Sequence, residues 1–164
     1  MESIFELVWL SSREHLRQFQ EIRDATPWYR ALLGGSYRVP QGFPFIQIGA
    51  RRFPLVFISG GTLTIAKNLI TFAPGSSSTA LGQTRHNVDA SLGFSIDIAL
   101  HPTFRRFRAP GTRSYFSIDW IELSLPESTF LLCAGASGPG MGGVNQGTDS
   151  LFTALSSWAG GHSS

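Results

Sequence analysis

The fold is decided by residues 115–158, which read YFSIDWIELSLPESTFLLCAGASGPGMGGVNQGTDSLFTALSSW. This stretch predicts two strands, a glycine-rich loop at 135–147 and a closing helix at 148–159. Thr148 stands at the N-cap position of that helix, and Gly160 suits the left-handed position after its end. A helix this short is stable only when its apolar face is covered, so we expect it to pack on the strands. That face is formed by Leu151, Phe152, Leu155 and Trp158.

The strand before the glycine-rich loop changes its hydrophobic phase. Its apolar side chains fall on even positions from 116 to 120 and on odd positions from 121 to 125. Because alternate residues of a strand face opposite sides, we expect a bulge or a break near Trp120. A turn at 126–128 then leads into a buried strand at 129–134.

Upstream, residues 37–114 predict further short strands separated by glycine and proline. The clearest is the period-two run at 94–100, which ends at His101-Pro102. Residues 75–92 read as a polar loop, and the pattern leaves its order open. The other expected strands are 43–48 paired with 53–59 across a turn at 49–52, and 62–66 paired with 69–72 across Lys67-Asn68.

Residues 1–36 have a different pattern, which we expect to pack on the main β unit formed by residues 37–160. Residues 4–10 predict a strand. Ser11 and Glu14 have the spacing of a capping box for a first helix, and Thr26 before Pro27 predicts the start of a second.

The composition is that of a single soluble domain spanning residues 1–164. With 42% hydrophobic residues the chain can bury a substantial core. Cys133 is the only cysteine, so no disulfide can form within the chain, and the first residues lack the pattern of a signal peptide. We expect a cytoplasmic protein. Its four histidines lack metal-ligand spacing, so we expect no metal and no cofactor.

The order of these segments carries a family resemblance. Residues 61–72 (GTLTIAKNLITF), 116–123 (FSIDWIEL) and 129–133 (TFLLC), followed by the last helix, resemble pleckstrin-homology-like domains of the GRAM and bacterial PH type over residues 40–160. The resemblance and the predicted strands imply a mainly β (α+β) fold. We expect a strongly bent sheet or partly open barrel of about seven or eight short strands, closed by the C-terminal helix. The long loop at 75–92 and the helical N-terminal segment depart from the family pattern.

The sequence contains no recognisable catalytic motif. Residues 138–143, GPGMGG, match the letters of a dinucleotide-binding loop but not its setting, which needs a helix that starts at the last glycine, inside a strand–helix–strand unit with an acidic residue about 20 positions on. Asp97, His101 and Cys133 are the only candidates that we can name for an enzyme, and each has an ordinary structural explanation. We therefore predict a non-catalytic protein.

Basic residues are concentrated in the middle of the chain. Residues 38–113 carry nine Lys or Arg against two acids, whereas residues 114–164 carry four acids and no base. After Pro102, arginines without a clean period are interleaved with two phenylalanines. We expect a docking surface for an acidic protein or an anionic ligand. The alternative is that the arginines pair with acids of this chain. The predicted partner-binding residues are Arg51, Arg52, Phe104, Arg105, Arg106, Phe107, Arg108 and Arg113.

The sequence therefore predicts a binding module for a protein with an acidic surface, and a bacterial immunity or antitoxin protein is a concrete version. Anionic-lipid binding is the alternative that the family resemblance implies, with Arg51-Arg52 as the part that is similar to the family's basic turn. A small enzyme without a recognisable motif is a third class. Nucleic acid is not expected as a partner, because Lys67 is the only lysine and the net charge is +2.

Overall fold

The computed structural model describes residues 2–26, 37–48, 51–75, 85–86, 93–110, 117–134 and 141–161. The helices are α1 (Arg13–Ala25) and α3 (Met141–Gly160), and the 3₁₀ turn η1 spans Ile98–Leu100. The strands are β1 (Ser3–Ser11), β2 (Phe45–Ile48), β3 (Arg51–Pro54), β4 (Ser59–Ile65), β5 (Leu69–Pro74), β6 (Arg85–His86), β7 (Phe94–Asp97), β8 (Thr103–Pro110), β9 (Ser117–Ser124) and β10 (Thr129–Ala134).

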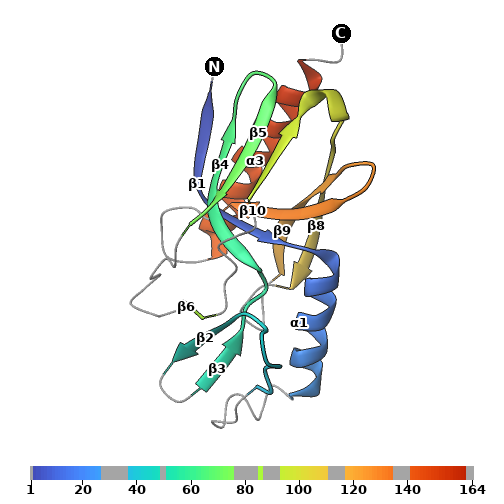
Figure 1. Cartoon of the computed structure of the whole chain (residues 1–164). Coiled ribbons are helices and arrows are strands. Elements are labelled where there is room, and N and C mark those ends of the chain that lie inside the picture. Colours follow the sequence, from blue (N-terminus) through green and yellow to red (C-terminus); the bar gives the residue numbers. More distant parts are fainter. Residues whose placement is uncertain are drawn as a thin grey trace.

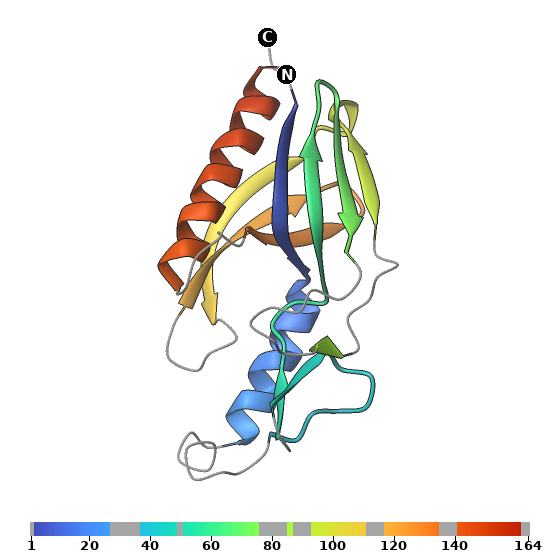
Figure 2. The same cartoon turned by 90° about the vertical axis from the view of Figure 1, so that its left-hand side faces the viewer.

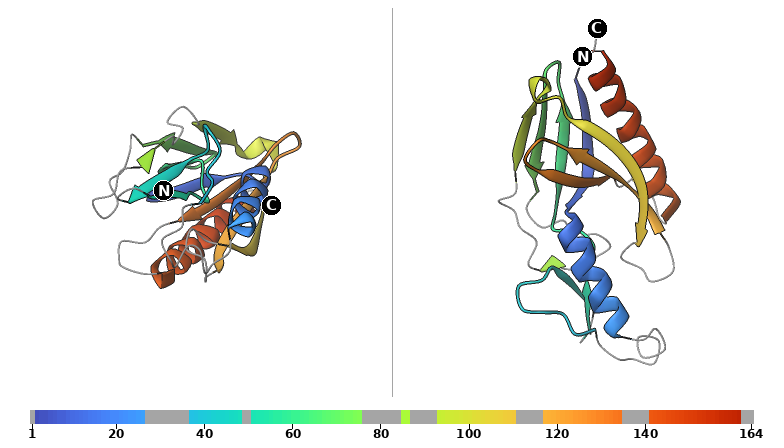
Figure 3. Two further views of the ribbon diagram at one scale, coloured as in Figure 1. Left: turned by 90° about the horizontal axis from the view of Figure 1, so that it is seen from below. Right: turned by 90° about the vertical axis from the view of Figure 1, so that its right-hand side faces the viewer.

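Seven strands form one strongly curled antiparallel sheet in the order β7-β5-β4-β1-β10-β9-β8 (Figure 1). Helix α3 covers one face of this sheet (Figure 2). A second sheet, β3-β2-β6, lies at the other end of the molecule beside α1 (Figure 3). The predicted fold class is thereby confirmed: the chain is mainly β, with a strongly bent sheet, a short N-terminal helix and a C-terminal helix.

The N-terminal segment supplies the middle of the large sheet. Strand β1 pairs with β4 on one side and with β10 on the other, where Trp9 lies opposite Cys133. The register of β1 against β4 shifts between Phe5 and Val8, which is the signature of a bulge. A strand expected to pack on the β unit is thus its central member.

Two hydrophobic cores lie on opposite sides of β9 and β10. The α3-side core contains Ile121 and Leu123 of β9 together with Leu151, Leu155 and Trp158 of α3. The α1-side core contains Ile118 and Trp120 of β9 together with Phe19 and Ile22 of α1. The predicted bulge near Trp120 is wrong, because β9 pairs in unbroken register with both neighbours. Apolar residues appear on both parities since this strand is buried on both faces.

Helix α1 begins one residue later than the capping-box pattern predicts. Ser12 is the N-cap, and its side chain accepts a hydrogen bond of 3.1 Å from the backbone N–H of His15. The Ser11 hydroxyl instead donates to the carbonyl of Val56 at 2.8 Å, inside the α1-side core. Phe19 and Ile22 are buried as the pattern predicts. The predicted second helix after Thr26 lies outside the described residues.

Helix α3 begins at Met141, seven positions before the predicted N-cap. Thr148 is therefore inside the helix and fully buried, and its Oγ1 accepts a hydrogen bond of 3.1 Å from the backbone N–H of Ala134. The N-cap prediction is wrong for this reason. Gly160 is the last helical residue and has no positive φ, so its predicted left-handed role is also wrong.

Other strand predictions hold with shifted ends. The hairpin across Lys67-Asn68 and the strand at 129–134 are confirmed. The predicted turn at 49–52 is partly strand, because β3 begins at Arg51, and the predicted strand at 53–59 is wrong beyond Pro54, where β3 ends. Strand β7 stops at Asp97, whose side chain accepts from the Ala99 N–H and caps η1. Residues 76–84, 87–92 and 135–140 of the predicted loops lie outside the part of the chain that is described.

Candidate binding site

Residues 104–108 of β8 form what we call the arginine edge. They belong to a strand that ends the large sheet, paired with β9 from Thr103 opposite Ser124 to Pro110 opposite Ser117. Directly opposed residues of an antiparallel pair share a face. The arginine edge therefore points Arg105 and Phe107 toward the α1 side of the sheet, and Phe104, Arg106 and Arg108 toward the α3 side.

On the α1 side, two arginines converge on one carboxylate. Arg105 donates to Glu122, its direct neighbour on β9, at 3.1 Å, and Arg13 at the start of α1 also donates to Glu122. The Arg13 guanidinium lies over the Phe107 ring at 5.0 Å from its centroid. The hydrogen bond from Arg13 is the main reason that the pKa of Glu122 is lowered, and Glu122 remains ionised at neutral pH.

On the α3 side, two arginines likewise donate to one carboxylate, that of Asp119. Arg108 donates its Nε–H to Asp119, which lies directly opposite on β9, at 2.9 Å, and Arg106 donates to the other carboxylate oxygen at 2.9 Å. Arg106 also pairs with Asp149 of α3 and lies 5.5 Å from the Phe152 ring centroid. These contacts tie β8, β9 and α3 together.

The ion pairs leave most of the Arg105 and Arg108 side chains exposed, and we call these two the outer arginines. The side chains of Arg105 and Arg108 are 65% and 68% exposed, whereas Glu122 and Asp119 are 12% and 15% exposed. A guanidinium has five N–H donors, and the hydrogen bonds to Glu122 and Asp119 use one from Arg105 and one from Arg108. Among the described residues that these ion pairs join, four guanidinium groups face three carboxylates, which leaves an excess of one positive charge.

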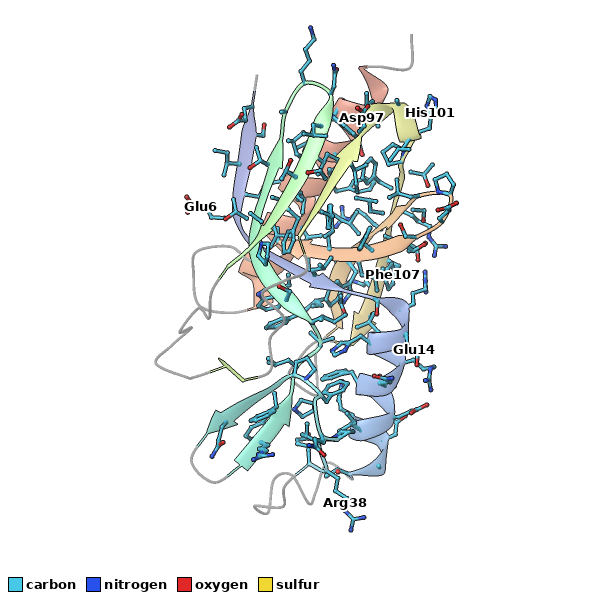
Figure 4. All side chains as sticks on the ribbon, viewed as in Figure 1. Glu6, Glu14, Arg38, Asp97, His101 and Phe107 are labelled. Atoms are coloured by element: carbon cyan, nitrogen blue, oxygen red, sulfur yellow. The ribbon has the colours of Figure 1, made fainter. Side chains whose placement is uncertain are left out.

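The two phenylalanines of the arginine edge face the cores rather than a partner. Phe104 packs against the α3-side core and meets Trp158 edge-on, with ring centroids 6.4 Å apart. Phe107 packs against the α1-side core, above α1 (Figure 4). Each face of β8 therefore carries one partly buried phenylalanine ring, which explains why this segment shows no regular hydrophobic period in the sequence.

The remaining predicted site residues do not join this surface. Arg51 and Arg52 lie on β3 of the small sheet (Figure 1), and the Arg52 guanidinium is 4.7 Å from the Phe45 ring centroid. Arg113 lies outside the described residues. The structure therefore brings together Arg105, Arg106 and Arg108, and it adds Arg13, which sequence reasoning missed because α1 is distant in the chain.

The three residues named for an enzyme do not form a site. Cys133 is buried in the α1-side core beside Thr148, and burial raises the pKa of its thiol to about 12. Asp97 and His101 lie at the η1 turn, at the opposite end of the molecule from Arg38 (Figure 4). Among the described residues, no group of three His, Cys, Asp or Glu side chains could hold a metal ion.

A groove of about 770 Å³ runs between α1 and residues 38–44. His15 at its base donates its Nε2–H to the Leu55 carbonyl at 2.8 Å and stacks on Phe43. Burial lowers the pKa of His15, so the ring is neutral. The described lining contains Gln18, Glu21 and Arg38 but no Ser, Thr or Cys, so it offers polar contacts and no nucleophile.

Neither described helix has the length and apolar character that a membrane crossing requires. No protein-family model matches the chain, and no curated protein and no solved structure is found to be similar to it. The resemblance to pleckstrin-homology-like domains therefore stays a prediction.

Proposed function

We propose that the chain is a non-catalytic binding protein that docks an acidic protein surface on the arginine edge. The observation that supports this most directly is the state of Arg105 and Arg108. Each is anchored by a largely buried carboxylate on β9, yet about two thirds of each side chain is exposed. An arginine held in one orientation loses less conformational entropy when a partner carboxylate binds to its free donors.

The charges around these arginines fit a protein partner better than a highly charged polymer. The ion-pair network retains one net positive charge, which steers an acidic surface without the broad basic footprint that nucleic acid requires. The proposal includes the cytoplasmic location expected from the sequence.

Affinity purification from the organism that encodes the chain, followed by mass spectrometry, tests the proposal. The double variant R105Q/R108Q removes both outer guanidinium groups and avoids placing like charges opposite Glu122 and Asp119. We expect it to bind the captured partner roughly tenfold more weakly than wild type. The matched control is R17Q on α1, which removes another exposed, ion-paired arginine.

Circular dichroism verifies that wild type and R105Q/R108Q are both folded. Equal capture of the same partner by the two proteins would then refute the proposal. Co-sedimentation with vesicles provides the comparison with a lipid ligand. Binding that depends on anionic lipid and on Arg105 and Arg108 would assign the surface to a membrane instead.

A further inference from the structure

Strand β8 has an outer edge that no other strand covers in the part of the chain that is described. It ends the seven-stranded sheet and pairs only with β9 there. Every second residue of such an edge directs its backbone N–H and C=O away from the sheet. Pro110 indicates which residues of β8 have outward-facing backbone groups.

Pro110 belongs to β8 and lies opposite Ser117, but proline has no N–H to give to a neighbouring strand. Within a sheet it is accommodated where its nitrogen faces the open side. Because the directions alternate, the backbone groups of residues 104, 106 and 108 face the open side as well, and those of residues 103, 105 and 107 face β9.

The hairpin between β9 and β10 independently indicates the same set of outward-facing residues on β8. The Leu125 N–H donates to the Ser128 carbonyl, so Leu125 bonds toward β10. Alternation then directs Leu123 and Ile121 toward β10 and Ser124, Glu122 and Trp120 toward β8. Their partners on β8 are Thr103, Arg105 and Phe107. Residues 104, 106 and 108 are again left with outward-facing amides.

The arginines do not close this edge. Natural proteins protect sheet edges with charges and prolines. Here Arg105 and Arg108 are bonded to residues directly across on β9, so their side chains lean over the sheet and not beyond it. Pro102 and Pro110 limit the edge at its two ends, and a stretch of open backbone remains between them.

We propose that this edge binds an extended acidic segment of the partner as an additional strand of the sheet. The inference rests on the proposed function and specifies how the partner is held. Main-chain hydrogen bonds to residues 104, 106 and 108 give affinity, while carboxylates of the segment reach the free donors of Arg105 on one face and Arg108 on the other.

The charge of this edge disfavours pairing with a second copy of the chain. If two β8 strands pair about a two-fold axis at residue 105, 106 or 107, at least one pair of arginines stands directly opposite. Like charges in that position are destabilising. The charge of the edge therefore favours an acidic strand over self-association.

Amide hydrogen exchange measured by NMR tests the pairing residue by residue. The probe is a synthetic peptide with the repeat Glu-Glu-Thr-Thr, which places carboxylates on both faces of an added strand, and a peptide with the repeat Lys-Lys-Thr-Thr is its control. In the free protein we expect the amides of Arg105 and Phe107 to exchange slowly and those of Phe104, Arg106 and Arg108 to exchange rapidly. Saturation with the Glu peptide should slow the second group roughly tenfold or more and leave the first unchanged.

Two variants separate main-chain pairing from side-chain contact. R108A and R108P both lose the guanidinium, but only R108P also loses the outward N–H. We expect R108P to bind the Glu peptide roughly tenfold more weakly than R108A. Equal binding by the two variants, or exchange rates unaffected by the peptide, would overturn strand addition and leave the docking proposal to the R105Q/R108Q capture experiment. A dimer that R108P dissolves would assign the edge to a second copy and overturn the acidic partner.

Discussion

Replacing Thr148 with valine tests the position of α3 against the sheet. Valine keeps the shape of the buried side chain but removes Oγ1, the acceptor of the Ala134 N–H at 3.1 Å. A buried donor left without a partner costs about 1–3 kcal/mol, whereas the difference in helix propensity between threonine and valine is small. We therefore expect the free energy of unfolding to fall by about 1–3 kcal/mol, because Thr148 is fully buried.

A second substitution distinguishes the helix interior from the N-cap. Asparagine is among the best N-cap residues, so T148N would be neutral if the helix began at residue 148. Inside α3 it would bury a further amide without a partner, and we expect T148N to be less stable than T148V.

Urea unfolding followed by circular dichroism measures both effects, through the midpoint at constant m-value. T153V is the matched control, since Thr153 is an exposed threonine of the same helix. The reasoning is refuted if T148V unfolds at the wild-type midpoint, or if T148N unfolds at or above it.

Three further predictions follow from buried or crowded positions. Because the pKa of His15 is lowered in the folded protein, the His15 ring of the unfolded chain takes up a proton just below about pH 6.5 while that of the folded chain does not. The free energy of unfolding should therefore fall as the pH drops below about 6.5, and H15Q should flatten the pH dependence of the urea midpoint. G61A should cost about 1–3 kcal/mol, because an added Cβ would lie 2.8 Å from the Pro74 Cα, whereas G160A, with open space around it, should not destabilise; equal midpoints would contradict this. The buried Cys133 thiol should react with iodoacetamide only after unfolding, and rapid labelling of the native protein would show that it is accessible.

The sequence predicts those parts of the fold that depend on neighbours in the chain. The Lys67-Asn68 hairpin and the strand at 129–134 follow from local turn chemistry and from a simple apolar run. Strand β8 could not be found in this way, because Phe104 and Phe107 enter different cores and leave no period in the sequence. The phase change at Trp120 was misread for the same reason: a strand between two cores has no polar face.

The start of α3 was missed because glycines at 142, 143 and 147 argue against a helix, and residue propensity is a weak guide where tertiary contacts decide. The arginine cluster was predictable as composition, but its pairing was not. Glu122 and Asp119 meet the arginines through the β8–β9 register, and Arg13 arrives from α1. The groove beside His15 likewise depends on residues 38–44 and Ile58 lying next to α1, which no local pattern shows.

The central place of β1 has a consequence for how the chain folds. The pairing of Trp9 with Cys133, and of Leu10 with Leu132, closes a loop that contains roughly three quarters of the chain. Rates of folding fall as native contacts become more distant in sequence, since the entropy of loop closure is lost before the contacts form. We expect slow refolding in which the β4–β5 hairpin forms early and the two halves of the sheet join last, at the seam between β1 and β10. A nascent chain in which β10 has not yet been made would expose one side of β1, and this transient open strand is where aggregation would begin.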